Sequence, residues 1–147
     1  MPNPKAVSKT TAPQELQKRR VQWAWNAVDT AASRGKKSDY LTEARKLPAR
    51  LLASGLGQSL AYLYSKRKER NPATAQGRDL LYRHVSERVA EVLDKEPPGP
   101  EGAMPIVVEL SAASYRRLSR ELLTSAEWLK RFAEGRLKDT DGEGESS

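Results

Sequence analysis

The sequence predicts an all-α fold, a single compact bundle of five to six helices. Apolar residues recur at helical spacing in successive segments, and Pro, Gly, Ser and Asp separate those segments. One short run, residues 105–110 (PIVVEL), is strand-like, and a single strand has no partner to pair with. The chain has 147 residues, the length of one domain. We expect a flexible segment over residues 1–12, a helical domain over residues 13–137 and a disordered acidic tail over residues 138–147.

The first helix is predicted over residues 13–33. Thr11 and Pro13 form a helix start with proline in the first turn, and Gly35 ends the helix. Trp25 is expected in the core, whereas Trp23 and Trp128 are candidates for facing a partner. The expected core stripe consists of Val21, Ala24, Trp25, Val28, Ala31 and Ala32.

The next region contains one proline and two glycines that divide it. Ser38 and Asp39 begin a segment that reaches about residue 47, and Pro48 either starts a further helical piece or kinks one long helix. Gly55 and Gly57 follow an apolar helical stretch rather than a strand, so they indicate a tight helix–helix turn or close packing instead of a phosphate-binding loop. Leu56, Leu60 and Leu63 continue at helical spacing.

Three further features complete the predicted bundle. A helix over residues 72–93 begins at Asn71 and Pro72 and turns Leu81, Val85, Val89 and Val92 inward. Residues 95–105 (KEPPGPEGAMP) form a long exposed connection, and PIVVEL is a packed helical turn or an extended lead-in. The last helix runs from Ser111 as N-cap over residues 112–134 to Gly135, with an apolar stripe of Tyr115, Leu118, Leu122, Leu129 and Phe132.

The residue inventory argues against catalysis and against metal or cofactor binding. The chain has no Cys and a single His, so a thiol nucleophile, a disulfide framework and a histidine metal site are excluded. His84 is interpreted as a structural residue. No stretch approaches the roughly 18 apolar residues that span a membrane, and we expect a cytoplasmic protein without a membrane partner.

The positive charge is concentrated in the part of the chain that is expected to fold. The net charge is +7, from 26 Lys+Arg and 19 Asp+Glu. Residues 139–147 carry four of the acids and no base, so residues 1–138 carry 26 minus 15, or +11. An excess of this size favours a polyanionic partner, and nucleic acid is the first candidate.

Basic residues gather in three places. Two groups are predicted to form a stripe that contacts nucleic-acid phosphates without reading sequence. The third begins the last helix, where the helix dipole disfavours positive charge, so it is predicted to bind a partner, through either acidic residues of another protein or phosphate. The first two groups are Arg45, Lys46 and Arg50, and Lys66, Arg67, Lys68 and Arg70; the third is Arg116, Arg117 and Arg120.

Two passages resemble the small helical subunit of the Cmr complex, the type III-B CRISPR effector. They are LTEARKLPARLLASGLGQSLAYLYSK at residues 41–66 and YRRLSRELLTSAEWLKRFAEG at residues 115–135. The shared features are a Leu-Pro beside basic residues, Gly-Leu-Gly-Gln before an apolar run, and the closing Trp-Leu-Lys-Arg-Phe-Ala.

The resemblance implies a non-catalytic subunit that stacks in several copies beside a filament of larger subunits carrying the CRISPR RNA. Such subunits help form the groove for target RNA, and other subunits cleave it. Lys46, Arg50 and Lys66 are the residues expected to face RNA. Two alternatives stay open: a stand-alone DNA-binding regulator that places a helix in the major groove, and a small RNA-cleaving enzyme of an unfamiliar kind.

Overall fold

The computed structural model describes residues 12–35, 38–68 and 72–137. Over these ranges the all-α prediction is confirmed: there are five helices and no strand. Except for Ala12, the predicted flexible segment lies outside the described residues, and so does the acidic tail. The same holds for three residues named above, Thr11, Arg70 and Asn71. The helices are α2 (Pro13–Ser33), α3 (Ser38–Lys66), α4 (Pro72–Val92), α5 (Met104–Val107) and α6 (Ala112–Arg136).

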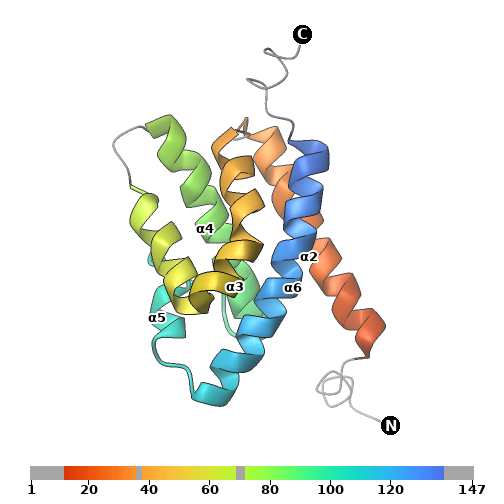
Figure 1. Cartoon of the computed structure of the whole chain (residues 1–147), viewed down its shortest axis with the longest axis vertical. Helices are drawn as coiled ribbons and strands as arrows, with labels where there is room; N and C mark the ends of the chain where they lie inside the picture. The colour runs from red at the N-terminus through yellow and green to blue at the C-terminus, as the bar shows by residue number, and fades with distance from the viewer. Residues whose placement is uncertain (1–11, 36–37, 69–71, 138–147) are drawn as a thin grey trace.

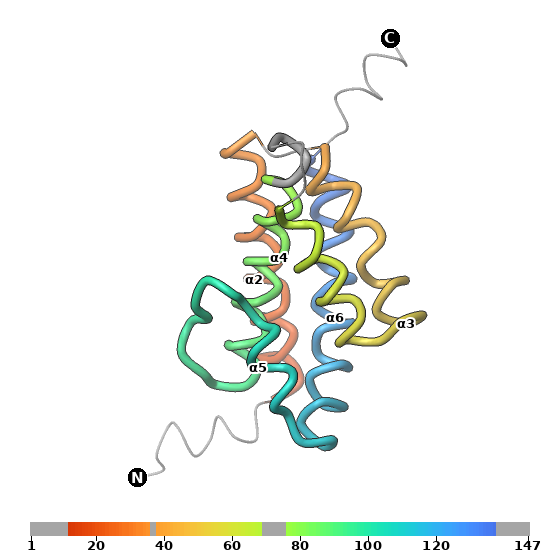
Figure 2. The backbone as a smooth tube through the Cα atoms, turned by 90° about the vertical axis from the view of Figure 1, so that its left-hand side faces the viewer, coloured from red at the N-terminus to blue at the C-terminus, as the bar shows by residue number. Residues whose placement is uncertain are grey.

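Helices α3 and α6 make most of the contacts between helices in the bundle. Helix α6 packs against both α2 and α3, and α3 also packs against α4. Figure 1 shows α3 descending beside α6, turning at its lower end and climbing back toward the start of α4. In the view turned by 90°, α4 and α2 lie on one side of the molecule and α3 and α6 on the other (Figure 2). Among the described residues, none of the helices combines the length and the apolar character needed to cross a membrane.

The turn inside α3 is made by Gly55, whose φ of 85° and ψ of 170° are not helical. A positive φ of this kind favours glycine because other residues clash there. Directly after it, the backbone N–H of Gly57 donates to Tyr115 Oη on α6 at 2.8 Å. The prediction of a tight turn and close packing at these glycines is therefore confirmed. Pro48 lies inside the helix and is buried. The non-helical backbone falls at Gly55, so the helix breaks there rather than at the proline.

The core stripe of α2 has the predicted period, but the placement of two tryptophans is wrong. Trp25 is 49% exposed, whereas Trp23 is 9% exposed and its Nε1 donates to the His84 carbonyl oxygen at 2.9 Å. Trp25 packs edge-on against Phe132 of α6, with ring centroids 5.3 Å apart. The buried face of α2 is rotated by part of a turn from the predicted face. Its buried residues are Trp23, Ala24, Ala27, Val28 and Ala31.

His84 is a structural residue, as predicted. It is 6% exposed, and its Nδ1 lies 2.7 Å from Tyr40 Oη. Burial, with smaller contributions from Arg34 and Arg83, lowers the pKa of His84 from 6.5 to about 4. The imidazole is therefore neutral at neutral pH and joins α4 to α3 through a hydrogen bond.

The connection after α4 is exposed in its first part, as predicted, but its end is fixed to the core. Tyr82 Oη donates to the Glu101 carbonyl oxygen at 2.6 Å, and Ser86 Oγ accepts from the Ala103 N–H at 2.9 Å. The PIVVEL run contributes the single-turn helix α5, which confirms the helical alternative. Ser111 caps α6 by accepting from the Ser114 N–H at 3.2 Å, and α6 continues past the predicted stop at Gly135 to Arg136.

Candidate nucleic-acid interface

Two of the predicted RNA-facing cations meet on a single aromatic ring. The guanidinium carbon of Arg50 lies 3.7 Å from the centroid of the Tyr62 ring, and Lys66 Nζ lies 5.9 Å from it. Arg50 comes before the turn at Gly55, whereas Tyr62 and Lys66 come after it. The turn therefore brings Arg50 of the first basic group and Lys66 of the second onto one face of the bundle.

A buried carboxylate holds this arrangement in place. The Glu43 side chain is 3% exposed, and its oxygens lie 3.5 Å from Arg50 and 3.4 Å from Arg78 of α4. Tyr62 Oη also donates to Glu43 at 3.1 Å. A carboxylate this far from solvent keeps its charge only with cations beside it. Glu43, Arg50, Tyr62 and Arg78 thus form one cluster, with Lys66 beside the Tyr62 ring.

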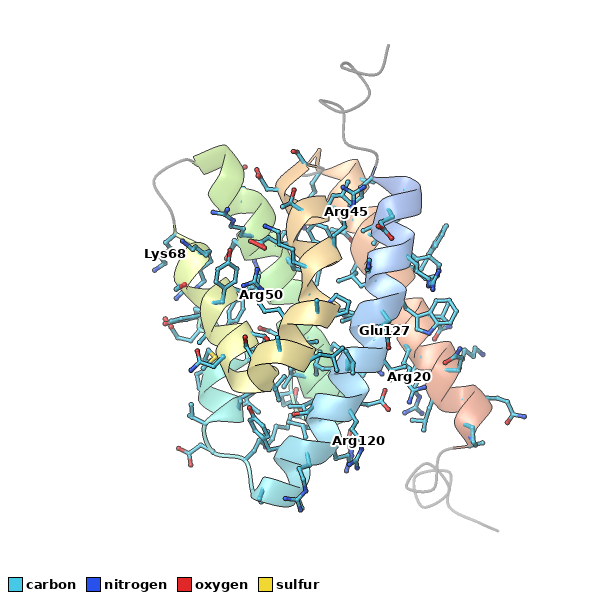
Figure 3. All side chains as sticks on the ribbon, in the orientation of Figure 1. Arg20, Arg45, Arg50, Lys68, Arg120 and Glu127 are labelled. Carbon is cyan, nitrogen blue, oxygen red and sulfur yellow. The ribbon has the colours of Figure 1, made fainter. Side chains whose placement is uncertain are left out.

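Lys46 and Arg45 extend the basic surface along the first half of α3. Lys46 is exposed and lies one helical turn before Arg50, so the two share a face. Arg45 is also exposed, and it lies 3.5 Å from Glu134 of α6. Figure 3 shows Arg45, Arg50 and Lys68 spread across the upper half of one view, whereas Arg120 lies at the lower end.

Arg67 points into a different set of contacts. Its side chain is 10% exposed, lies 4.1 Å from the Tyr64 ring centroid and pairs with Glu101 at 3.2 Å. A hydrogen bond from Tyr64, together with the nearby cations Arg67 and Lys68, lowers the pKa of Glu101 below its usual value. Arg67 thus links the loop before α5 to the end of α3, and only a small part of its side chain is accessible to RNA.

The three arginines that begin α6 are also divided between two roles. Arg117 donates to the Val92 carbonyl oxygen at 2.9 Å and so caps the C-terminal end of α4. Arg116 and Arg120 are exposed and lie one helical turn apart. Arg117 is exposed as well, so all three arginines of the predicted partner-binding group lie at the surface, and Arg117 in addition contacts the end of α4.

Sequence reasoning missed Glu43 and Arg78 and left the role of Tyr62 open. The signal for Glu43 was available, because it lies three residues after Tyr40 and four before Leu47, the helical spacing of the buried face of α3. Arg78 gave no such signal, since its approach depends on how α4 crosses α3. That crossing is close at Gly77, where an added Cβ would lie 2.9 Å from Asp39 Cβ.

Comparison with known proteins identifies the family. The sequence model of the CRISPR-associated protein family Cas_Cmr5 matches residues 16–136, most of the chain. The chain belongs to the Cmr5 family. A Thermus thermophilus relative named "CRISPR system Cmr subunit Cmr5" is 32% identical over 122 residues, which cover 80% of this chain and 92% of the relative.

The fold of this Cmr5-family chain also matches a solved structure. The crystal structure of a CRISPR-associated Cmr5 family protein from Thermus thermophilus aligns with a TM-score of 0.60 at 29% identity. The alignment covers 81% of this chain and 95% of the solved chain. The resemblance inferred from residues 41–66 and 115–135 is therefore confirmed at the level of the family.

Glu43 is expected to stabilise the Cmr5-family fold as well as its basic face. Glu43→Gln should lower the free energy of unfolding by about 2 kcal/mol, because Arg50 and Arg78 would then share a half-buried site without a counter-charge. Urea denaturation measures the loss. Glu134→Gln is the matched control: its pair with Arg45 has side chains 42% and 47% exposed, so its loss should stay below about 0.5 kcal/mol. Equal losses would contradict the stabilising role of Glu43.

Proposed function

We propose that the chain is a non-catalytic subunit of the type III-B Cmr complex in antiviral defence. Several copies stack beside the larger subunits that carry the CRISPR RNA, and each copy turns its basic α3 face toward the groove for target RNA. Its partners are the other Cmr subunits, further copies of itself, CRISPR RNA and target RNA. The RNA contacts are to the backbone and are independent of sequence.

The observation that carries the proposal is the convergence of Lys46, Arg50 and Lys66 on one face of α3. Cations that meet on one surface raise the local concentration of a polyanion, whereas cations dispersed over the molecule do not. Membership of the Cmr5 family supports RNA as the polyanion and supports the larger subunits as neighbours. The use of His84 as a buried hydrogen-bonding residue fits a structural role for the chain.

Charge reversal of the two lysines tests this face. Lys46→Glu with Lys66→Glu should weaken target-RNA binding by the reassembled complex by at least about tenfold at moderate salt, because repulsion replaces two phosphate contacts. Arg50 is left unchanged here, since a carboxylate at that position would oppose the buried Glu43. Filter binding or fluorescence anisotropy gives the affinity.

The control is Lys18→Glu with Lys95→Glu, which changes the net charge equally at exposed positions on α2 and in the loop after α4. This variant should bind target RNA within about twofold of the wild type, since neither residue lies on the α3 face. Equal weakening by both variants would reduce the effect to net charge and would contradict the proposed face.

Affinity purification of the full chain from its native cells tests the assembly. Larger Cmr subunits and a guide RNA should co-purify with it. Recovery of a duplex DNA site without those subunits would instead favour the DNA-binding regulator.

A further inference from the structure

Arg50 is held as a flat, oriented surface. One face of its guanidinium lies on the Tyr62 ring at 3.7 Å, a stacking distance, and one edge meets Glu43 at 3.5 Å. The ring limits the tilt of the guanidinium plane, and the carboxylate attracts one edge of it at ion-pair distance. Even so, 25% of the side chain remains exposed. The guanidinium therefore presents a surface to solvent whose orientation is set before any ligand arrives.

The same stacking occurs at Arg67, but there it is closed off. Arg67 lies over Tyr64 at 4.1 Å and pairs with Glu101, and its side chain is 10% exposed. Arg78 is the second arginine beside Glu43, and its side chain is 20% exposed. Of these three arginines, Arg50 combines a guanidinium stacked on a ring with the greatest access to solvent.

The pairing with Glu43 changes what Arg50 is suited to bind. A phosphate would have to compete with a buried carboxylate that already lies beside the guanidinium edge. A nucleobase would not, because it stacks on the guanidinium plane and does not need the edge that faces Glu43. Arginine planes and aromatic rings both stack unpaired bases without regard to sequence, and a plane fixed in advance loses less entropy on binding.

We propose that Arg50, held on Tyr62 by Glu43, is a stacking platform for one unpaired base of single-stranded RNA. This inference rests on the proposed function, since it requires RNA to reach the α3 face. Lys46, one helical turn before Arg50, and Lys66, which lies near the same Tyr62 ring, bind the backbone, and Arg50 takes the base. The site therefore favours a single strand over a duplex, whose bases are stacked on each other and closed to a protein side chain.

The test compares two strands on the full chain. Fluorescence anisotropy at low salt measures binding of a labelled single-stranded RNA and of an abasic strand of the same length and charge. The wild type should bind the RNA at least about fivefold more tightly, which is the lower range for stacking of one base. Equal affinity for the two strands overturns the stacking inference. Failure to bind either strand overturns the proposed function instead.

The variant Arg50→Lys distinguishes the effect of the planar guanidinium on RNA binding from the effect of its positive charge. Lysine keeps the positive charge beside Glu43 but has no planar group, so this variant should lose about fivefold or more in affinity for RNA and less than about twofold for the abasic strand. Lys46→Gln is the matched control and should weaken both strands equally, with a salt slope smaller by about 0.7. Equal losses on both strands for Arg50→Lys, or no loss on either, overturn the platform.

Discussion

Gly102→Ala is expected to lower the free energy of unfolding by about 3 kcal/mol. Gly102 has a φ of +67°, a conformation that costs an L residue about 1 kcal/mol or more. An added Cβ would also lie 2.6 Å from Ser86 Oγ and 2.8 Å from Tyr82 Cζ. Tyr82 is 1% exposed and cannot move aside, so overpacking adds about 1–3 kcal/mol.

Gly99→Ala provides a control in the same loop. An added Cβ at Gly99 meets nothing within 4 Å, and its φ lies outside the positive region. Its loss should stay within about 0.5 kcal/mol. Urea denaturation of both variants measures the difference, and similar losses would contradict the view that the loop is fixed at Gly102.

The packing of Gly102 depends on contacts that the local sequence does not reveal. The run KEPPGPEGAMP predicts an exposed connection, which holds for its first part, whereas its last two residues, Met104 and Pro105, begin helix α5. Nothing in the run indicates that its end packs onto Tyr82 and Ser86 of α4. Those contacts join residues far apart in the chain, and local propensity carries no information about them.

The helices were more predictable than the faces they present. Caps, prolines and apolar spacing depend on neighbours within a turn or two, so the bounds of α2 and the cap of α6 at Ser111 follow from sequence. The rotation of a helix depends on what packs against it. The apolar positions of α2 fit a helical stripe centred on Trp25 or on Trp23, and contact with His84 of α4 decides for Trp23.

The basic residues of the candidate interface could be predicted from the sequence, but the contacts that each of them makes could not. Basic residues at 45–50 and 66–67 could be recognised as two groups, and the glycines between them indicated a turn. That Arg67 turns toward Glu101, while Arg50 shares Tyr62 with Lys66, depends on where the turn in α3 and the loop before α5 place these side chains. A charge count treats these arginines alike, whereas the fold gives them different partners.

His84 is expected to make the protein less stable as the pH falls from about 6.5 to 4. Burial lowers the pKa of His84 from 6.5 to about 4 in the folded state. Between these values the unfolded chain binds a proton at this residue and the folded chain does not, so the free energy of unfolding rises with pH. The full difference amounts to about 3 kcal/mol, and it is complete below the folded pKa.

A neighbouring carboxyl group works against this slope, so the measurement needs a paired variant. Burial raises the pKa of Glu87, which makes the fold lose stability as the pH rises above 4.5. His84→Asn removes the imidazole titration, and its amide can occupy the position of Nδ1 beside Tyr40 Oη. As the pH falls from about 6.5 to 4, the free energy of unfolding, measured by urea at several pH values, should then fall less for this variant than for the wild type, by up to about 3 kcal/mol. Parallel curves for the two proteins would mean that His84 has the same pKa folded and unfolded, and would contradict the view that burial disfavours the protonated ring.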